Sequence, residues 1–470
     1  MRKNLEFKKV PMKNILLSAL VLVPTFAYAN DFGLVNVVLK PPQVALARTP
    51  DQNSKNTSLD TSPDNAKKQA EYFQRGLYMM SAHRYAEAIS NYTEALRIAP
   101  TARTLLNRAV AYNLSGNPDA AIQDLTSAVR LAPKEWIAYS YRGDIYASQK
   151  KIDLAIADYT KIIEIKPDNA TVYKARAVLL INSGKPDAAI EDLTEAIRLT
   201  PGDERLYCLR AIAFAALNRD QSALMDYATT LRIHPDFAAV YSSRSLTLER
   251  EGRFVDAVQD LTDYLRLSPD DAHAYSQRAD DLVVLGKDEA ARKDYATAED
   301  LDPDLAALFY GRGGSEFDYG EFSASISDLG RYLQLGSVQN NDIRDKQNSY
   351  AVIWRYLAAL RSNSDGTSML LADVGQLDKK KWPYPIVAYF LGSLSESQLW
   401  AATRSTDPQI RLNRTCEIHT YLGEIKIARG QVAQAKVNFE HALKECPVSF
   451  TETTLSKREL DRLSQLPNRL

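Results

Sequence analysis

Small and large apolar residues recur through the middle of the chain at helical spacing, with a period of 34 residues that is once 33. Each repeat has a first small residue, a second small residue twelve positions later and a large residue four positions after that. The first small residues are Gly76, Ala109, Gly143, Ala177, Ala211, Ser245, Ala279 and Gly313. The second are Ala88, Ala121, Ala155, Ala189, Ala223, Ala257, Ala291 and Ser325, and the large residues are Tyr92, Leu125, Tyr159, Leu193, Tyr227, Leu261, Tyr295 and Leu329. The pattern predicts two antiparallel helices per repeat, A and B, which approach closely at the small residues and enclose the large one.

Helix-breaking residues mark the ends of these predicted helices. A proline closes almost every repeat, at Pro100, Pro133, Pro167, Pro201, Pro235, Pro269 and Pro303. Glycine-containing turns such as residues 115–117 and 183–185 separate helix A from helix B. A single helix pair cannot bury its own apolar face, so we expect eight stacked units over residues 69–336.

These positions resemble the tetratricopeptide repeat (TPR) family over roughly two-thirds of the chain. The resemblance implies an all-α fold, a right-handed superhelix (solenoid) of antiparallel helix pairs. It also implies a concave face, lined mainly by A helices, that receives a peptide or a partner helix.

An arginine directly precedes each first small residue, and an acid follows sixteen residues after the arginine in seven of the units. The arginines are Arg75, Arg108, Arg142, Arg176, Arg210, Arg244, Arg278 and Arg312, and the acids are Asp124, Asp158, Asp192, Asp226, Asp260, Asp294 and Asp328. Asn91 stands at the matching place in the first unit. The strict phase favours structural ion pairs between helix A and helix B over a ladder of functional cations.

The repeat period breaks after Gly336 and returns near the end of the chain. Residues 337–415 have helical patterning without the repeat, over residues 350–361, 368–377 and 385–391. A terminal unit is expected over residues 416–449, where Gly423, Ala435 and Phe439 have the repeat spacing, followed by a closing helix and tail over residues 450–470. Such a divergent end is typical of a helical cap on a solenoid.

Segments of this C-terminal part resemble the NlpI lipoprotein family: residues 353–358, 381–386, 389–392 and 420–424 match in order and rough spacing. That family is a dimeric, periplasm-facing TPR scaffold that brings cell-wall hydrolases and a protease together. The resemblance therefore implies a periplasmic adaptor and is compatible with a homodimer.

The first 29 residues have the three parts of a secretory signal: five basic residues, an apolar run over residues 15–26, and Ala27-Tyr28-Ala29. The run is too short to span a membrane, so we expect a cleaved signal peptide, no stable membrane insertion afterwards, and a periplasmic protein, with secretion as second choice. Residues 30–68 change from apolar to polar and are expected to be a linker, partly disordered. The 58 basic and 59 acidic side chains alternate along the chain, which argues against a nucleic-acid partner.

Two of the three cysteines fall at corresponding ends of the terminal helix pair. We expect Cys416 to open helix A and Cys446 to close helix B, which predicts a disulfide suited to an oxidising compartment. On the chain-entropy estimate a bridge of this length stabilises the cap by roughly 3 to 4 kcal/mol. Cys208 is left as a buried, apolar side chain.

The sequence offers no catalytic constellation. The histidines His83, His234, His273, His419 and His441 lie in different units or at ordinary helix positions, and no phosphate-binding or nucleophile-elbow motif is present. His419 and His441 share the terminal unit, but the motif supplies no further zinc ligands. We expect a protein that is not an enzyme, with no cofactor and no metal.

A binding surface is expected at exposed A-helix positions that differ from unit to unit. By analogy with the TPR family the candidates are Asn113, Asp144, Lys174, Asn182, Arg205, Glu249, Arg250, His273, Asp280 and Tyr310. Their mixed charges favour a polar, extended peptide over a single apolar helix. The expected function is a non-catalytic scaffold or adaptor for protein or peptide partners in the cell envelope; the alternative is a structural or assembly subunit of an envelope or secretion complex.

Overall fold

The computed structural model describes residues 63–335, 342–447 and 450–465, and these residues form helices and turns without strands. The chain divides into two compact units, which we call the first body (described from residue 63 to 237) and the second body (from 238 to 465, with the two gaps). The predicted signal peptide and linker residues 30–62 lie outside the described residues.

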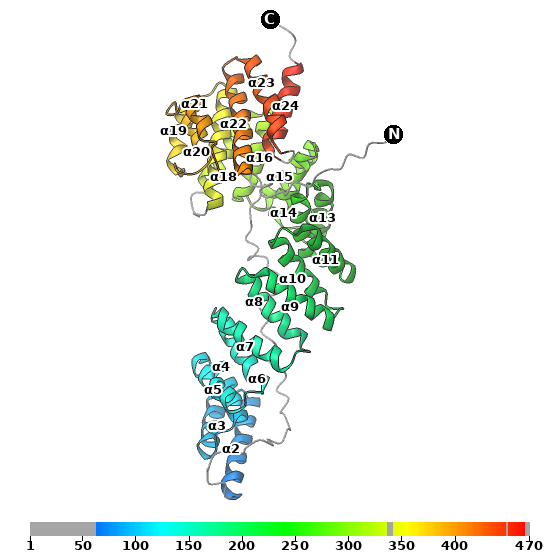
Figure 1. The fold of residues 1–470 in the computed structure, drawn as a ribbon, viewed down its shortest axis with the longest axis vertical. Helices are drawn as coiled ribbons and strands as arrows, with labels where there is room; N and C mark the ends of the chain where they lie inside the picture. Colours follow the sequence, from blue (N-terminus) through cyan, green and yellow to red (C-terminus); the bar gives the residue numbers. More distant parts are fainter. Residues whose placement is uncertain (1–62, 336–341, 448–449, 466–470) are drawn as a thin grey trace. The chain divides into compact units, whose positions relative to one another are not determined.

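The first body consists of five antiparallel helix pairs (Figure 1). The A helices are α2 (Pro63–Ser81), α4 (Ala102–Leu114), α6 (Trp136–Ser148), α8 (Ala170–Asn182) and α10 (Glu204–Ala216). The B helices are α3 (Tyr85–Ile98), α5 (Pro118–Leu131), α7 (Ile152–Ile165), α9 (Pro186–Leu199) and α11 (Asp220–Ile233). Each B helix packs on its own A helix, and α3, α5, α7 and α9 also contact the next A helix, as the repeat period predicts.

The second body begins with three more pairs of the same kind. They are α12 (Ala238–Arg250) with α13 (Phe254–Leu267), α14 (Ala272–Val284) with α15 (Asp288–Leu301), and α16 (Ala306–Tyr319) with α17 (Phe322–Leu335). The non-repeat segment follows as α18 (Asp342–Arg361), α19 (Gly366–Asp373), a 3₁₀ turn η2 (Val374–Gln376), α20 (Tyr384–Phe390) and α21 (Glu396–Ala401). The chain then forms α22 (Pro408–Ala428), α23 (Val432–Glu445) and α24 (Thr451–Gln465).

Small residues at the A–B crossing have the role that the sequence predicted. A Cβ atom added to Gly143 would lie 2.9 Å from Tyr159 Cε1, and one added to Gly423 would lie 2.6 Å from Phe439 Cε1. Tyr159 and Phe439 are themselves almost completely buried. The glycines therefore allow the two backbones to approach closely enough for the aromatic ring to fill the space between them.

Seven arginines on A helices each bind the predicted aspartate on the paired B helix through two parallel hydrogen bonds. The pairs are Arg108–Asp124, Arg142–Asp158, Arg176–Asp192, Arg210–Asp226, Arg244–Asp260, Arg278–Asp294 and Arg312–Asp328, with N–O distances from 2.5 to 3.1 Å. We call each of these pairs a clamp. The aspartates are buried, so the clamps satisfy charges that would otherwise be costly inside the array.

The clamps also join neighbouring units. In five of them the remaining guanidinium nitrogen donates to a threonine of the preceding B helix at 2.8 to 3.2 Å: Thr93, Thr126, Thr160, Thr194 and Thr262. Each such arginine therefore connects three helices. In the first unit, by contrast, Arg75 is exposed and the Asn91 amide donates to the backbone of its own helix.

Several helix boundaries differ from the sequence expectation. Helix α18 begins at Asp342, eight residues before the helix expected over residues 350–361. Helix α2 begins at Pro63, so residues 63–68 are helical and not part of a linker. Helix α21 and the first two turns of α22 lie where no helix was expected. Because α22 begins at Pro408, Cys416 lies inside this helix and does not open it. The closing helix is present as α24.

Candidate functional site

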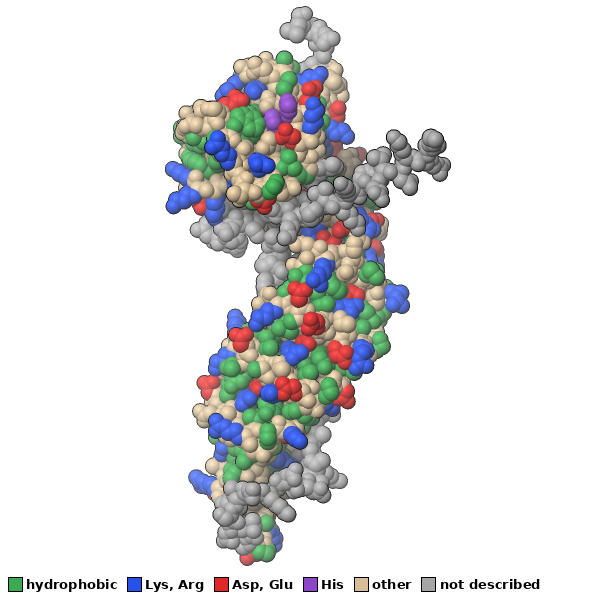
Figure 2. Space-filling view, viewed as in Figure 1, with side chains coloured by type: hydrophobic (Ala, Val, Ile, Leu, Met, Phe, Trp, Pro, Cys, Tyr) green, Lys and Arg blue, Asp and Glu red, His purple; other side chains and the backbone are tan. Residues whose placement is uncertain are grey.

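The ten candidate binding residues all lie on A helices, five in each body. Figure 2 shows that acidic and basic side chains are interspersed on the visible face of the repeats. The two bodies are described separately below.

In the first body the candidates form a polar, partly accessible row. Asn113 at the end of α4 and Arg205 at the start of α10 are exposed, and Asn182 at the end of α8 is half-buried. Lys174 on α8 binds Asp203, the residue that caps α10, with an Nζ–Oδ2 distance of 3.2 Å. This ion pair links two consecutive A helices and leaves Arg205 beside it as an exposed cation.

Asp144 on α6 accepts a hydrogen bond from a buried tyrosine of the paired helix α7. The Tyr159 hydroxyl donates to Asp144 Oδ1 at 2.7 Å. Burial raises the pKa of Asp144 to about 7, and the hydrogen bond from Tyr159 opposes this rise. A carboxyl group with this pKa can act as an acceptor or, once protonated, as a donor toward a ligand near neutral pH.

In the second body, three acids and one amide on α12 and α14 lie close together. Glu249 is buried and accepts a hydrogen bond from Gln277 Nε2 at 2.6 Å. Asp280 accepts one from the Tyr295 hydroxyl at 2.5 Å, and Asp281 is buried beside them with Oδ2 unpaired. Burial raises the pKa of Glu249 and of Asp280 to about 7, and that of Asp281 well above its usual value.

The structure corrects the expectation that all ten candidates are exposed. Glu249 and Tyr310 are buried, at 5% and 4% exposure. The Tyr310 ring lies between Tyr332 on α17 and Trp354 on α18, with ring centroids 5.1 and 5.5 Å apart. A partner could reach Tyr310 only by displacing α18, so this residue serves the core. His273 remains exposed and Arg250 half-buried.

Tyr310 is buried because α18 and α24 cover the last A helices of the array, whereas Glu249 is buried between α12 and α14. Arg458 on α24 reaches Asp318 Oδ2 on α16 at 3.3 Å and the Val283 carbonyl on α14 at 3.4 Å. Arg462 donates to the carbonyl of Asp318. Sequence analysis missed these residues. The available signal was the pair of arginines spaced one helical turn apart in the closing helix.

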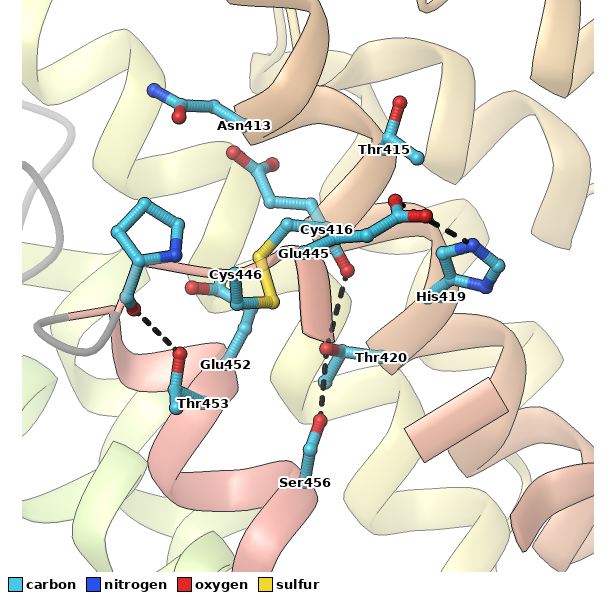
Figure 3. Close-up of a disulfide and its surroundings, with 12 residues drawn as sticks. Asn413, Thr415, Cys416, His419, Thr420, Glu445, Cys446, Glu452, Thr453 and Ser456 are labelled. Atoms are coloured by element: carbon cyan, nitrogen blue, oxygen red, sulfur yellow. Dashed lines mark hydrogen bonds and ion pairs between the residues drawn. A yellow bond between two sulfur atoms is a disulfide. The ribbon is translucent and has the colours of Figure 1, made fainter. Parts of the chain in front are cut away.

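The terminal helix pair carries the predicted cysteine pair (Figure 3). The sulfur atoms of Cys416 on α22 and Cys446 after α23 are 2.13 Å apart, with the Cα atoms 4.9 Å apart. Cys208 on α10 is buried as expected, and burial raises the pKa of its thiol to about 12. Cys208 is therefore a poor nucleophile in the folded protein.

None of the helices in the described part of the chain combines the length and the apolar character needed to span a bilayer.

The accessible candidates in the first body belong to a polar surface on paired helices. This arrangement offers hydrogen-bonding and charged groups for a protein or peptide ligand.

Comparison with known proteins finds a repeat family in the first body. The tetratricopeptide repeat family profile matches residues 73–135, 115–170 and 174–236. Part of a TPR-containing protein from Cytophaga hutchinsonii is similar at 17% identity and a TM-score of 0.45, over 51% of this chain and 98% of that one. MamA protein is similar at 20% identity and a TM-score of 0.35, over 36% of this chain and 93% of that one. YrrB, described as a TPR protein with an unusual peptide-binding site, is similar at 18% identity and a TM-score of 0.37, over 40% of this chain and 97% of that one.

Proposed function

We propose that this all-α TPR solenoid is a non-catalytic scaffold that binds a protein or an extended polar peptide on the A helices of its first body. The observation that carries the proposal is that each unit combines constant structural positions with variable A-helix positions. The clamps recur in seven units and the small residues in all eight, while other A-helix positions vary from unit to unit, for example Asp144 where Val110 and Val178 lie in the neighbouring units. A constant frame with a varied surface is suited to recognition and brings no reacting groups together.

The binding residues that we propose are those accessible in the first body: Asn113, Asp144, Lys174, Asn182 and Arg205. They offer two cations, one carboxyl group and two amides, which can bind both the backbone and the charged side chains of an extended peptide. Arg250 and His273 extend the proposal to the second body, where they are the accessible members of the set.

We place the protein in the periplasm, as an adaptor for envelope enzymes such as cell-wall hydrolases or a protease. The signal-like first 29 residues, the C-terminal resemblance to the NlpI lipoprotein family and the bonded cysteine pair support this placement. An adaptor of this kind acts by raising the local concentration of the partners that it holds.

The test is a crosslinked pull-down of the full chain from its native envelope, with partners identified by mass spectrometry. A triple variant, Lys174→Glu with Arg205→Glu and Arg250→Glu, should lose the partner. The matched control reverses three exposed arginines on B helices, Arg97, Arg198 and Arg232, and should keep it. Equal capture of the partner by both variants would refute binding on the A helices. Recovery of only further copies of this chain, or of secretion-complex subunits, would favour a structural subunit.

A further inference from the structure

The terminal helix pair differs from the array in the residue types near the start of helix A and the end of helix B. We number each unit so that its first small residue is position eight. Position four, near the start of helix A, is then aromatic in all array units except the second: Tyr72, Tyr139, Tyr173, Tyr207, Tyr241, Tyr275 and Phe309. Position thirty is always Ile or Leu: Ile98, Leu131, Ile165, Leu199, Ile233, Leu267, Leu301 and Leu335. In the terminal unit these two positions are His419 and Glu445, and position 26 is His441. At these three positions the terminal unit thus carries groups that can bind metals.

The structure brings these three side chains together. His419 comes from α22, and His441 and Glu445 come from one face of α23, one helical turn apart. One possible ligand atom of each lies within 4.8 Å of the other two. The imidazole rings of His419 and His441 stack with centroids 5.0 Å apart. Figure 3 shows His419 beside Glu445, with 3.9 Å between His419 Nε2 and Glu445 Oε2. Sequence analysis found no third ligand because it did not align Glu445 with the two histidines.

A neighbouring amide orients the His419 ring. Asn438 Nδ2 donates to the Gln434 carbonyl at 2.8 Å, which leaves Asn438 Oδ1 as the acceptor for His419 Nδ1 at 3.4 Å. The hydrogen of the neutral ring is thereby placed on Nδ1, and the lone pair of Nε2 faces Glu445. A polar partner on the second ring nitrogen is the usual support of a metal-binding histidine.

Asn438 itself is available because the terminal unit lacks the clamp. It occupies the position of the clamp aspartate, and Leu422 occupies that of the arginine. The cysteine pair fixes the two helices beside the site, since Cys446 follows Glu445 directly and Cys416 lies one turn before His419. The Trp400 ring also lies against His419, with centroids 4.8 Å apart. The spacing of α22 and α23 at this point is therefore held in place.

We propose that His419, His441 and Glu445 form a binding site for a zinc-type divalent transition-metal ion. Two imidazoles and one carboxylate with an open fourth position are a common zinc ligand set. Tetrahedral bonds to zinc place ligand atoms about 3.3 Å apart, so the three groups must close by about 1.5 Å. His441 is exposed and can leave the stacked position without disturbing the core. The open position would accept water or a donor group from a partner.

The site is tested on the untagged full chain with Cys416 and Cys446 oxidised, by calorimetric titration with Zn²⁺ and by the absorption spectrum of bound Co²⁺. We expect one ion per chain and a tetrahedral Co²⁺ spectrum. His441→Ala and Glu445→Gln should each weaken binding by at least about tenfold. Both changes are on α23 and spare the buried face, so circular dichroism should be unchanged.

The control variants are His273→Ala and Glu440→Gln, which remove an exposed histidine of another unit and an exposed acid next to His441. Both should bind Zn²⁺ as the parent chain does. No binding at millimolar Zn²⁺, or binding that His441→Ala and Glu445→Gln leave unchanged, would overturn the proposal.

Discussion

The two bodies use charged side chains in different ways. In both bodies buried acids bind arginines of the same unit sixteen residues away, and the first body adds only pairs between neighbouring units, such as Lys174 with Asp203, among its described residues. In the second body, the additional helices bring together residues far apart in the chain, such as Arg458 with Asp318 and Tyr350 with Glu417. The first body is therefore a sum of local units, whereas the second depends on long-range contacts that must form together.

The difference matters for function because it decides which A helices remain accessible. Helices α18 and α24 cover the last A helices of the second body and convert Tyr310 and Asp318 into core residues. The first body has no such cover among its described residues. The comparison thus assigns recognition mainly to the first body and capping mainly to the second.

Removing the cysteine pair should have the largest effect, and only on the second body. The bridge closes a sequence separation of 30 residues, and its loss through Cys416→Ala with Cys446→Ala should lower the stability of α22–α24 by about 3 to 4 kcal/mol. Hydrogen exchange should show faster opening of these helices and unchanged protection of α2–α11. Equal loss of protection in both bodies would mean that they do not unfold as separate units.

Breaking one clamp should have the next largest effect. Asp192→Ala leaves the Arg176 guanidinium, 19% exposed, without its carboxylate, and should destabilise the first body by about 2 to 3 kcal/mol in urea unfolding. The natural control is Arg75→Ala, because Arg75 is exposed and has Asn91 at the clamp position. Similar effects of the two changes would contradict a structural role for the clamps.

Acidification should stabilise the second body more than the first. Burial raises the pKa values of Glu249, Asp280 and Asp318 to about 7, far above those of the unfolded chain. The folded second body therefore binds more protons between about pH 4 and pH 7, and its stability should fall as pH rises through this window. Melting curves from pH 5 to pH 8 should show this decline, and Glu249→Gln should reduce it. A melting temperature of the second body that rises over the same range would contradict this assignment.

Cys208 gives a smaller effect that reports on the first body alone. Its thiol is buried and its pKa is raised to about 12, so it should react with a thiol reagent only when α10 opens. Asp192→Ala should accelerate this labelling, while the double cysteine substitution in the second body should not. Rapid labelling of the parent chain would show that α10 is less protected than its burial indicates.

The repeat period allowed the helix pairs, the small residues at their crossings and all seven clamps to be predicted, because each depends on residues at a fixed distance within one or two units. The burial of Glu249 and Tyr310 could not be predicted in this way. It depends on Gln277, at a repeat position whose residue type varies from unit to unit, and on Trp354, which lies outside the repeat.

Two helix starts were missed although their capping residues are visible in the sequence. Ser395 and Gln398 form a capping box at the start of α21, and Asp407 caps α22, which begins with Pro408. The metal-binding cluster was missed for a related reason. His419, His441 and Glu445 come together only when the terminal unit is placed in the frame of the array.

The most direct test of the central claim is site-specific photo-crosslinking of the full chain in its native envelope, with the crosslinker placed at one position at a time. Arg205 on helix A and Met225 on helix B lie in the same unit of the first body, and both are exposed. We predict a discrete crosslinked partner from Arg205 and none from Met225. Crosslinking from Met225 alone would contradict recognition by the A helices.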